Sequence, residues 1–287
     1  MGRYSKTVDF LSFLFLLFLI IITGLFHSRI PDFWPRIGRY CLLMGLLAGL
    51  IYARETRDGP ILRFLHSFSP VALVAIIYDS MDVVPYINPQ DLDSWLIQLD
   101  LRLLGVHPTL WLERITFPWL TELMQVAYTA YYIMPLVLAW TLYRQGREEE
   151  FDTTVFSTVF ALYLSFLGYL LVPALGPRFA LAHLQRVELK GLFLAEPIRR
   201  FLDFWEGIKR DAFPSGHTAV VVIILYFAHR YQRNLYFLFL PIVLTLIFST
   251  VYARYHYVVD VMAGLLLAFF CIILGPPLSA ALKRSRP

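Results

Sequence analysis

Charged residues are scarce in this sequence. They make up 16% of its 287 residues, whereas hydrophobic residues make up 58%. Because ordinary soluble domains carry about 25% charged residues, this composition excludes a soluble domain with a mostly polar surface. The net charge of +4 is small and scattered along the chain, so we expect no nucleic-acid partner.

Cysteine is also rare. The two cysteines, Cys41 and Cys271, lie in apolar runs outside any CxxC pair or ligand cluster, and we interpret them as small buried residues. Most of the histidines lack the spacing of a metal-ligand set: His27, His66, His107, His183 and His229. The sequence therefore predicts neither a metal site nor a cofactor.

Long apolar runs are abundant. A helix needs about 20 residues to cross the hydrocarbon core, and several runs approach this length: roughly Phe10–Phe26, Tyr40–Tyr52, Ile61–Tyr78, Leu120–Tyr143, Thr153–Val172, Thr218–Tyr231, Leu235–Tyr252 and Tyr257–Leu274. They predict an all-α fold, a polytopic helical membrane bundle of about eight transmembrane helices. We expect one integral membrane domain over residues 1–287, with N-terminal spans in 1–80 and a helical core in 117–275.

The first apolar run follows a basic N-terminal segment, an arrangement that resembles a signal peptide. The run from Phe10 to Phe26 is long for that purpose, and no cleavage site of small residues follows it. We therefore expect it to remain as the first helix.

Residues 91–116 lie between the third and fourth runs and differ from both. Their sequence, DLDSWLIQLDLRLLGVHPTLWLERIT, alternates apolar and charged residues at helical spacing, with Trp95 and Trp111 toward its ends. This pattern is typical of helices that lie in the membrane interface. Such helices could shape a lipid entrance or serve packing alone.

Basic residues predict the orientation of the bundle. The positive-inside rule assigns to the cytoplasm the loops and tail that carry Arg54, Arg57, Arg144, Arg147, Arg230, Arg233, Lys283, Arg284 and Arg286. With an even number of spans, both termini lie on that side. Residues 91–116 and the long loop 173–214 then face outward. That loop is itself basic, which an anion-binding role would explain.

Three short segments carry most of the reactive side chains, all at the predicted outer ends of spans. They are Leu175–Arg178 (LGPR), Asp211–His217 (DAFPSGH) and Arg254–Asp260 (RYHYVVD). An even number of spans separates the second from the third. We therefore expect all three at the same face of the membrane.

The second segment opens a helix. Ser215 is a plausible N-cap, and a helix N-terminus with free N–H groups suits a phosphate. Gly216 lets an anion approach the backbone, and His217 in the first turn can donate a proton. The alternative is an ordinary cap with an interfacial histidine.

The third segment pairs His256 with Asp260. Side chains four apart share a helix face, so Asp260 can accept a hydrogen bond from one imidazole nitrogen and leave the other basic. The alternative is a structural His–Asp pair at a helix end. Arg178 and Arg254 flank the histidines and suit phosphate oxygens, although a single arginine at a membrane boundary is usually an anchor.

Together, PSGH and the downstream H-x-x-x-D resemble the phosphatidic acid phosphatase type 2 superfamily of membrane enzymes, over roughly residues 170–264. GPRF, DAFPSGH and YARYHYVVDVMAG are particularly similar to the branch that includes the inositol phosphorylceramide synthases. The resemblance implies a six-helix phosphatase-type core inside the bundle. It also implies that His256 is a nucleophile that forms a phosphohistidine, that Asp260 holds it, and that His217 is the general acid.

By the same resemblance, the phosphoryl oxygens are cradled without a metal by Arg178, Ser215, Gly216 and Arg254. The chain departs from the family pattern at two cations. Leu171 stands where the first motif has a lysine, and Thr250 where the third motif has an arginine. Arg254 would have to replace that arginine from a different position.

The resemblance implies a lipid phosphate or phospholipid substrate, and the distribution of basic residues predicts that the site lies at the extracytoplasmic face. With water as acceptor the chain is a lipid phosphatase. With an alcohol as acceptor it is a phosphotransferase, and the sequence leaves both open. The competing class is a non-catalytic lipid transporter, which usually places its ionisable groups near the bilayer midplane. The reactive residues here lie at span ends, which favours interfacial chemistry.

Overall fold

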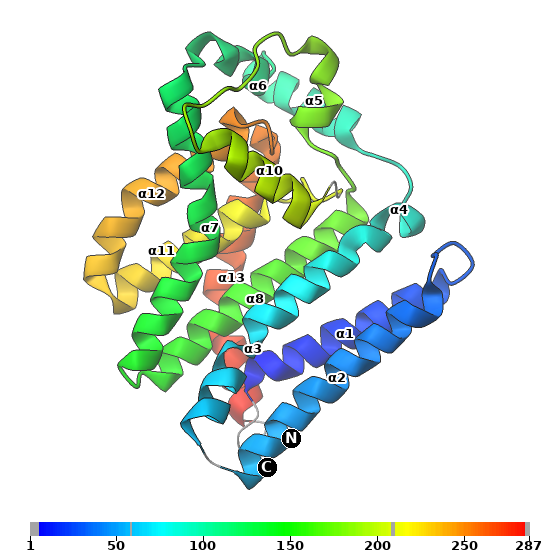
Figure 1. Ribbon diagram of the computed structural model, residues 1–287, viewed down its shortest axis with the longest axis vertical. Helices are drawn as coiled ribbons and strands as arrows, with labels where there is room; N and C mark the ends of the chain where they lie inside the picture. Colours follow the sequence, from blue (N-terminus) through cyan, green and yellow to red (C-terminus); the bar gives the residue numbers. More distant parts are fainter. Residues whose placement is uncertain (1–5, 58, 208–209, 285–287) are drawn as a thin grey trace.

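The computed structural model describes residues 6–57, 59–207 and 210–284, and every regular element in them is a helix (Figure 1). Seven of these helical segments are long and apolar enough to cross a membrane. They are α1 (Thr7–Leu25), α2 (Phe33–Thr56), α3 (Pro60–Asp79), α7 (Pro118–Arg144), α8 (Glu148–Leu171), α12 (Arg233–Tyr252) and α13 (Val258–Arg284). The short helices η1 (Ser80–Val83) and α4 (Val84–Ile87) continue α3. The predicted all-α membrane bundle is confirmed.

An eighth helix, α11 (Gly216–Tyr231), has 16 residues and is shorter than the others. It packs against α12 as a hairpin. The two ends of this hairpin lie close together, because α11 begins after Ser215 and α12 is followed by α13. The Ser215 N–H donates to the carbonyl of Asp260 in the first turn of α13, across 3.0 Å. The eight predicted spans thus correspond to these eight helices.

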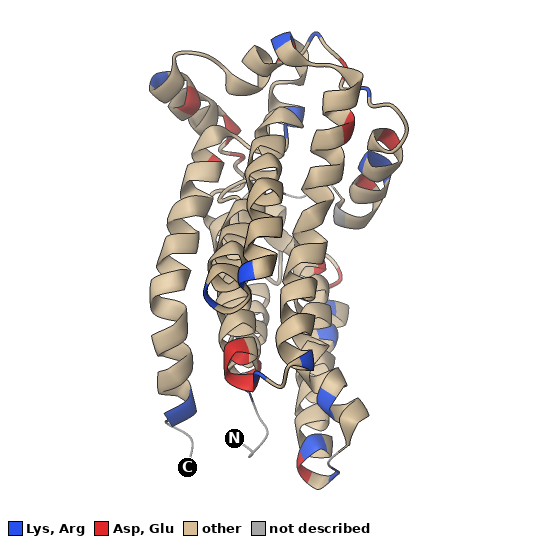
Figure 2. Cartoon of the chain, turned by 90° about the vertical axis from the view of Figure 1, so that its left-hand side faces the viewer, with Lys and Arg blue, Asp and Glu red and all other residues tan. Residues whose placement is uncertain are grey.

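The first and last helices meet at one end of the bundle. The buried hydroxyls of Thr7 and Ser279 lie 3.0 Å apart, and Lys6 and Lys283 both pair with Asp152. Most charged residues lie toward the two ends of the bundle, with long uncharged stretches between them (Figure 2). Arg286, which the orientation argument also used, lies outside the described residues.

Helix α8 lies at the centre, in contact with α1, α3, α7, α11 and α13. The ring of Tyr163 in α8 stacks on the ring of Phe15 in α1, with the two centroids 4.4 Å apart. Cys271 is buried, as predicted, but Cys41 is exposed. The prediction for Cys41 is wrong because α2 packs on the outside of the bundle and leaves most of its residues at least partly exposed.

The predicted interfacial segment does form helices, α5 (Asp93–Leu104), α6 (Pro108–Trp111) and η2 (Leu112–Ile115), which cap one end of the bundle (Figure 1). The segment 173–214, expected as a loop, holds three more: α9 (Pro177–Ala180), η3 (Ala182–Leu184) and α10 (Ala195–Glu206). Phe201, Phe204 and Trp205 of α10 are exposed, which suits a helix at a membrane surface.

Several helices extend beyond the apolar runs that predicted them. Helix α8 begins at Glu148, and its first turn contains three glutamates. Helix α13 ends with Lys283 and Arg284 in its last turn. Acidic side chains at a helix N-terminus and basic ones at its C-terminus are favourable to the helix dipole. Apolar patterning does not detect such ends.

Candidate active site

Three sequence segments meet at the end of the bundle beneath α5 and α10. The Ala212 N–H donates to the Ala174 carbonyl, and the Arg178 N–H donates to the Arg254 carbonyl across 2.8 Å. Gly176 has a φ of +89°, and a Cβ there would lie 2.6 Å from the Tyr255 carbonyl oxygen. The three segments, predicted to lie at one face of the membrane, are therefore in contact with one another, and a glycine is required where they touch.

The second segment caps α11. Ser215 is the N-cap, and its Oγ accepts from the Thr218 N–H at 3.3 Å. Helix geometry leaves the N–H groups of Gly216 and His217 without intrahelical acceptors. A Cβ on Gly216 would lie 2.9 Å from the Tyr169 hydroxyl. The glycine therefore also lets α11 approach α8 closely.

The third segment begins with the turn that ends α12. Tyr255 N donates to Thr250 O at 2.9 Å, and Arg254 N donates to Val251 O at 3.0 Å. This pair of bonds is a Schellman motif, whose C′ residue is left-handed and usually glycine. Here it is Arg254, with a φ of +66°. The His256 N–H also donates to Thr250 O, so the turn fixes the backbone of His256.

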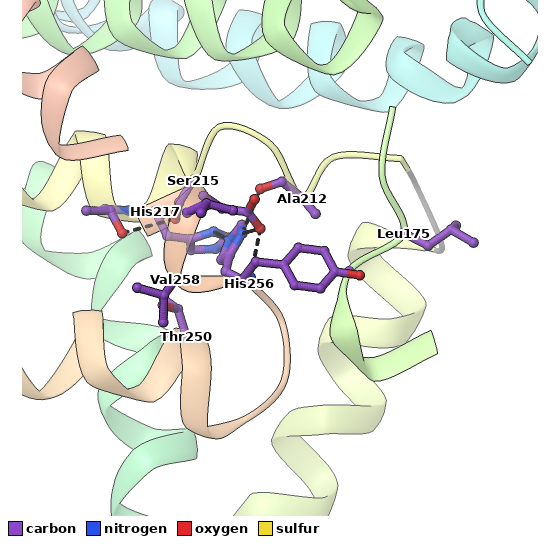
Figure 3. Close-up of polar contacts among 12 residues, drawn as sticks. Leu175, Ala212, Ser215, His217, Thr250, His256 and Val258 are labelled. Atoms are coloured by element: carbon purple, nitrogen blue, oxygen red, sulfur yellow. Dashed lines mark hydrogen bonds and ion pairs between the residues drawn. The ribbon is translucent and has the colours of Figure 1, made fainter. Parts of the chain in front are cut away.

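The two histidine rings lie together inside the site (Figure 3). His256 Nδ1 donates to the Ala212 carbonyl at 2.8 Å, and His256 Nε2 lies 3.5 Å from His217 Nδ1. A donating Nδ1 leaves Nε2 with a basic lone pair. His217 Nε2 is buried and has no hydrogen-bond partner in the structure.

The predicted hydrogen bond from His256 to Asp260 is corrected by this geometry. His256 Nδ1 lies 3.6 Å from Asp260 Oδ2, and the Ala212 carbonyl is closer. The reason is that His256 precedes α13, so the two residues are not on one helix face. Asp260 Oδ2 instead accepts from the Tyr257 N–H at 2.8 Å. Asp260 is fully buried, and its carboxyl group still faces the imidazole.

A model of the PAP2 superfamily matches residues 94–274, which contain all of these residues. The chain belongs to the PAP2 superfamily. It is also similar to a PA-phosphatase related-family protein of Dictyostelium discoideum, with 26% identity over 175 residues. The match covers 54% of this chain and spans about a third of that relative's length, 32%. No solved structure matches the chain.

Membership of the superfamily supports a phosphatase- or phosphotransferase-type activity. Other contacts of this PAP2 site were not apparent from sequence. Tyr128 and Tyr131 of α7 have their rings 4.5 and 4.2 Å from the ring of His217. Tyr128 also lies 4.5 Å from Tyr255. These rings pack against the imidazole and restrict its orientation.

Two aspartates of α5 hold the site loops. Asp93 accepts from the N–H groups of Leu175 and Gly176, both at 2.9 Å, and from the Tyr257 hydroxyl at 2.7 Å. Asp100 accepts from Val258 N at 3.0 Å and Val259 N at 2.9 Å. Asp100 thereby caps α13, and burial raises the pKa of its carboxyl. Helix α5 is thus a positioning element of the PAP2 site.

Arg178, predicted to bind phosphate, lies at the mouth of the site and lines the cavity that holds the histidines. Its guanidinium makes two hydrogen bonds to Asp203 of α10, at 2.5 and 2.7 Å. These bonds raise the pKa of Arg178. Helix α10 is in turn fixed by Glu122 of α7, whose carboxylate accepts from the N–H groups of residues 192–195. The sequence contained no local signal for either contact.

Arg254 lines the same cavity, but its terminal nitrogens are engaged. They donate to Gln185 and Glu113, each at 2.9 Å, and to the Val187 carbonyl at 2.6 Å. Burial lowers the pKa of Arg254. The predicted contact of Arg254 with phosphate would require an exchange of these partners.

The two positions that depart from the family pattern do not supply a charge. Leu171 is 73% exposed at the end of α8. The Thr250 hydroxyl donates to Ile247 O, and its carbonyl builds the turn before His256. Within residues 6–57, 59–207 and 210–284, no group of three or more metal-ligating side chains could hold a metal ion.

Proposed function

We propose that this PAP2 protein is a membrane-embedded, metal-independent lipid phosphate phosphatase that acts through a phosphohistidine on His256. The observation that carries the proposal is the orientation of the two imidazoles. Nδ1 of His256 is held by the Ala212 carbonyl at 2.8 Å, so the lone pair of Nε2 faces His217 across 3.5 Å. A nucleophile and a proton donor are therefore adjacent in one cavity.

In the first step, Nε2 of His256 attacks phosphorus and the bond from phosphorus to the lipid oxygen breaks. His217 gives its proton to the leaving oxygen, which departs as the lipid alcohol. The positive charge on the phosphorylated imidazole is stabilised by Asp260 and by the Ala212 carbonyl. The N–H groups at the start of α11 and the guanidinium of Arg178 bind the phosphoryl oxygens.

In the second step, neutral His217 accepts a proton from a water molecule as that water attacks phosphorus. The bond from phosphorus to Nε2 breaks, phosphate leaves, and both histidines return to their starting states. Throughout the cycle the Nδ1 proton of His256 stays on its nitrogen. The steps are those expected of a covalent phosphoryl transfer with one general acid–base group.

We also propose that the site faces away from the cytoplasm. The end of the bundle opposite the site holds a basic cluster that includes Arg147, Arg230 and Lys283. The positive-inside rule assigns such an end to the cytoplasm, which supports an extracytoplasmic site. Both ends of the chain then face the cytoplasm.

The test is phosphate release by the purified protein in detergent with a chelator present. Phosphatidate, phosphatidylglycerol phosphate and undecaprenyl diphosphate are the three substrates. We expect release that is insensitive to the chelator and absent in His256→Ala. His229→Ala is the matched control, because His229 is on α11 but lies at the opposite end, beside Arg233. Release that requires a metal, or that survives in His256→Ala, contradicts the proposal.

A second candidate is a phosphotransferase that moves a phospho-headgroup to an alcohol, as in the inositol phosphorylceramide synthase-like branch. Its support is the low positive charge of the site. Leu171 and Thr250 replace two family cations, and both remaining arginines are paired with a carboxylate, Arg178 with Asp203 and Arg254 with Glu113. Such a site suits a phosphodiester with one negative charge better than a monoester with two.

The two candidates share the phosphohistidine and differ in its acceptor. Incubation with a labelled phospholipid donor and with inositol, sugar or ceramide-like alcohols distinguishes them. Transfer of label to an alcohol, with little free phosphate, identifies a transferase. Uptake of lipid that survives loss of both histidines would instead indicate a transporter.

A further inference from the structure

A cavity of about 690 Å³ extends from the two histidines into the membrane-spanning part of the bundle. Its walls are α3 and α7, and its floor is formed by α8 and α11. We call this part the α3–α7 groove. It is lined, from the site downward, by residues such as Tyr78, Tyr132, Leu162, Val155 and Val71. It is therefore continuous with the proposed reaction centre.

The wall of the groove is apolar even where hydroxyls occur. Thr154 and Thr158 of α8 donate to the carbonyls of Glu150 and Thr154 in their own helix. Their hydroxyl protons are thus already used within α8. A polar headgroup would find few partners there, whereas a hydrocarbon chain needs none.

The far end of the groove is closed by aromatic rings. Phe68 of α3 lies 5.5 Å from Tyr143 of α7 and 5.7 Å from Phe151 of α8, measured between ring centroids. Phe64 and Trp140 extend this contact, with centroids 6.2 Å apart. In Figure 1, α3 and α7 separate from this end toward the site. The groove is thus open to the histidines and closed at the other end.

Helix geometry gives the length of the groove. From Tyr169 to Thr154 of α8, and from Asp79 to Ser67 of α3, the axial rise is roughly 22 and 18 Å. Carbon–carbon bonds of about 1.5 Å at tetrahedral angles advance an extended chain by about 1.25 Å per carbon. A chain of about 16 carbons therefore reaches from the site to the closed end.

The volume indicates one chain. A dry protein cavity of about 150 Å³ holds one benzene ring, or about 25 Å³ per carbon. The whole cavity of about 690 Å³ then holds on the order of 25 carbon-sized groups, which is one such chain with a headgroup. Val71, Ala75 and Leu136 line the groove and are also exposed. The side is therefore open, and a second chain can remain in the bilayer.

We propose that the α3–α7 groove binds one extended hydrocarbon chain of the substrate and selects chains of about 16 carbons. The inference rests on the proposed function for the identity of the headgroup. The selection arises from packing, because the chain moves from lipid rather than from water into the groove. Short chains leave a void at the aromatic end, and long chains meet its rings.

The test uses single-chain lysophosphatidates from about 8 to about 20 carbons, which bracket the estimated length, in mixed micelles of constant composition. We expect kcat/KM to peak near 16 carbons and to fall about fivefold or more toward either extreme. A flat profile, or one that rises steadily with chain length, overturns the proposal.

Two substitutions shorten the groove at different depths. Val71→Trp fills its lower part, and Ala75→Trp fills it one helical turn nearer the site. Four residues correspond to about 6 Å, so the optimum should be about five carbons shorter in Ala75→Trp than in Val71→Trp. Ala72→Trp is the matched control, because Ala72 is exposed but does not line the cavity. An equal shift in Ala72→Trp contradicts a groove at this face.

A binding measurement separates the two proposals. The inactive His256→Ala variant is equilibrated with the same lipids, and the chain length retained is read by native mass spectrometry. A 16-carbon preference there, with no phosphate release by the unmodified protein, supports the groove and contradicts the phosphatase. Release without any chain preference in either assay contradicts the groove alone.

Discussion

Arg178 and Asp203 face each other at the mouth of the cavity, joined by two hydrogen bonds of 2.5 and 2.7 Å. Both side chains line the cavity that contains the two histidines. A guanidinium group binds a phosphate with the same paired geometry that it uses for a carboxylate. Asp203 therefore occupies the contacts that a substrate phosphate needs on Arg178.

We predict that Asp203→Asn lowers KM by up to about fivefold and leaves kcat nearly unchanged, since a partly exposed ion pair is worth up to about 1 kcal/mol. Steady-state kinetics in mixed micelles measure this change. Glu196→Gln is the control, because Glu196 is on the same helix and pairs with Arg199 and Arg200 instead. A higher KM in Asp203→Asn would show that α10 assists binding through this pair.

The roles of the two histidines predict different dependence on the leaving group. We expect His217→Ala to lower kcat on a lipid phosphate by about 10²–10⁴, the usual contribution of a general acid–base group. With p-nitrophenyl phosphate, whose leaving group departs as a stable anion, the loss in the rate of the first turnover should be much smaller, whereas hydrolysis of the phosphohistidine still needs His217. His256→Ala should be inactive on both.

A second readout for these variants is the covalent intermediate. Rapid quenching with labelled substrate should give an acid-labile, base-stable phosphoprotein in the unmodified enzyme and none in His256→Ala. Equal losses in the first-turnover rate on both substrates in His217→Ala would mean that His217 does not protonate the leaving group.

Arg254 is predicted to fix the turn that ends α12 and precedes His256. If it holds Gln185, Val187 and Glu113 to the turn, then Glu113→Gln and Arg254→Gly should both lower kcat/KM. If instead Arg254 binds phosphate, Glu113→Gln frees it and lowers KM. Glycine suits the left-handed position and relieves about 1–2 kcal/mol of backbone strain. In Arg254→Gly this relief should offset part of the stability that is lost with the side-chain hydrogen bonds. The thermal midpoint in detergent should therefore fall by less than the loss of those bonds alone would cause.

Asp100 is predicted to stabilise the fold. Asp100→Asn replaces a carboxylate that accepts from Val258 and Val259 with an amide that has one acceptor oxygen. We expect a loss of about 1–3 kcal/mol, seen as a lower thermal midpoint in detergent. Gln98→Ala on the same helix is the control, because Gln98 is exposed. An unchanged midpoint would mean that the start of α13 is held by other contacts.

The pKa of Asp100 gives this contribution a pH dependence. Burial raises its pKa in the folded protein above the unfolded value near 3.8, so the folded state binds the proton more tightly. The stabilisation linked to that proton is full below the unfolded value and is lost as pH rises through the folded one. The thermal midpoint should therefore fall as pH rises from the unfolded to the folded pKa of Asp100. In Asp100→Asn, the fall that is due to this group should be absent.

The long helices could be predicted because a membrane span is a local property of composition. Each apolar run is itself the helix, and the errors lie at polar ends such as Glu148. Helix α10 could not be predicted in the same way, because its apolar face alternates with charges inside a polar segment. Its position depends on Glu122, which is 70 or more residues away in the sequence.

The candidate site was only partly predictable for the same reason. Ser215 caps its helix through a contact with Thr218, the residue that follows the PSGH motif, so the local pattern predicts it. Asp93 and Asp100 bond to residues 82 to 164 positions away, and nothing near them marks that role. The His256–Asp260 bond was mispredicted because it assumed a helix that begins two residues later, at Val258.

The groove and the mouth of the site open into different solvents. In the proposed reaction, inorganic phosphate departs past Arg178 into water, whereas the lipid alcohol moves sideways between α3 and α7 into hydrocarbon. The two products therefore separate into phases that do not mix. Reversal then requires both products to return to one pocket from opposite phases, so the separation of the products slows the reverse reaction.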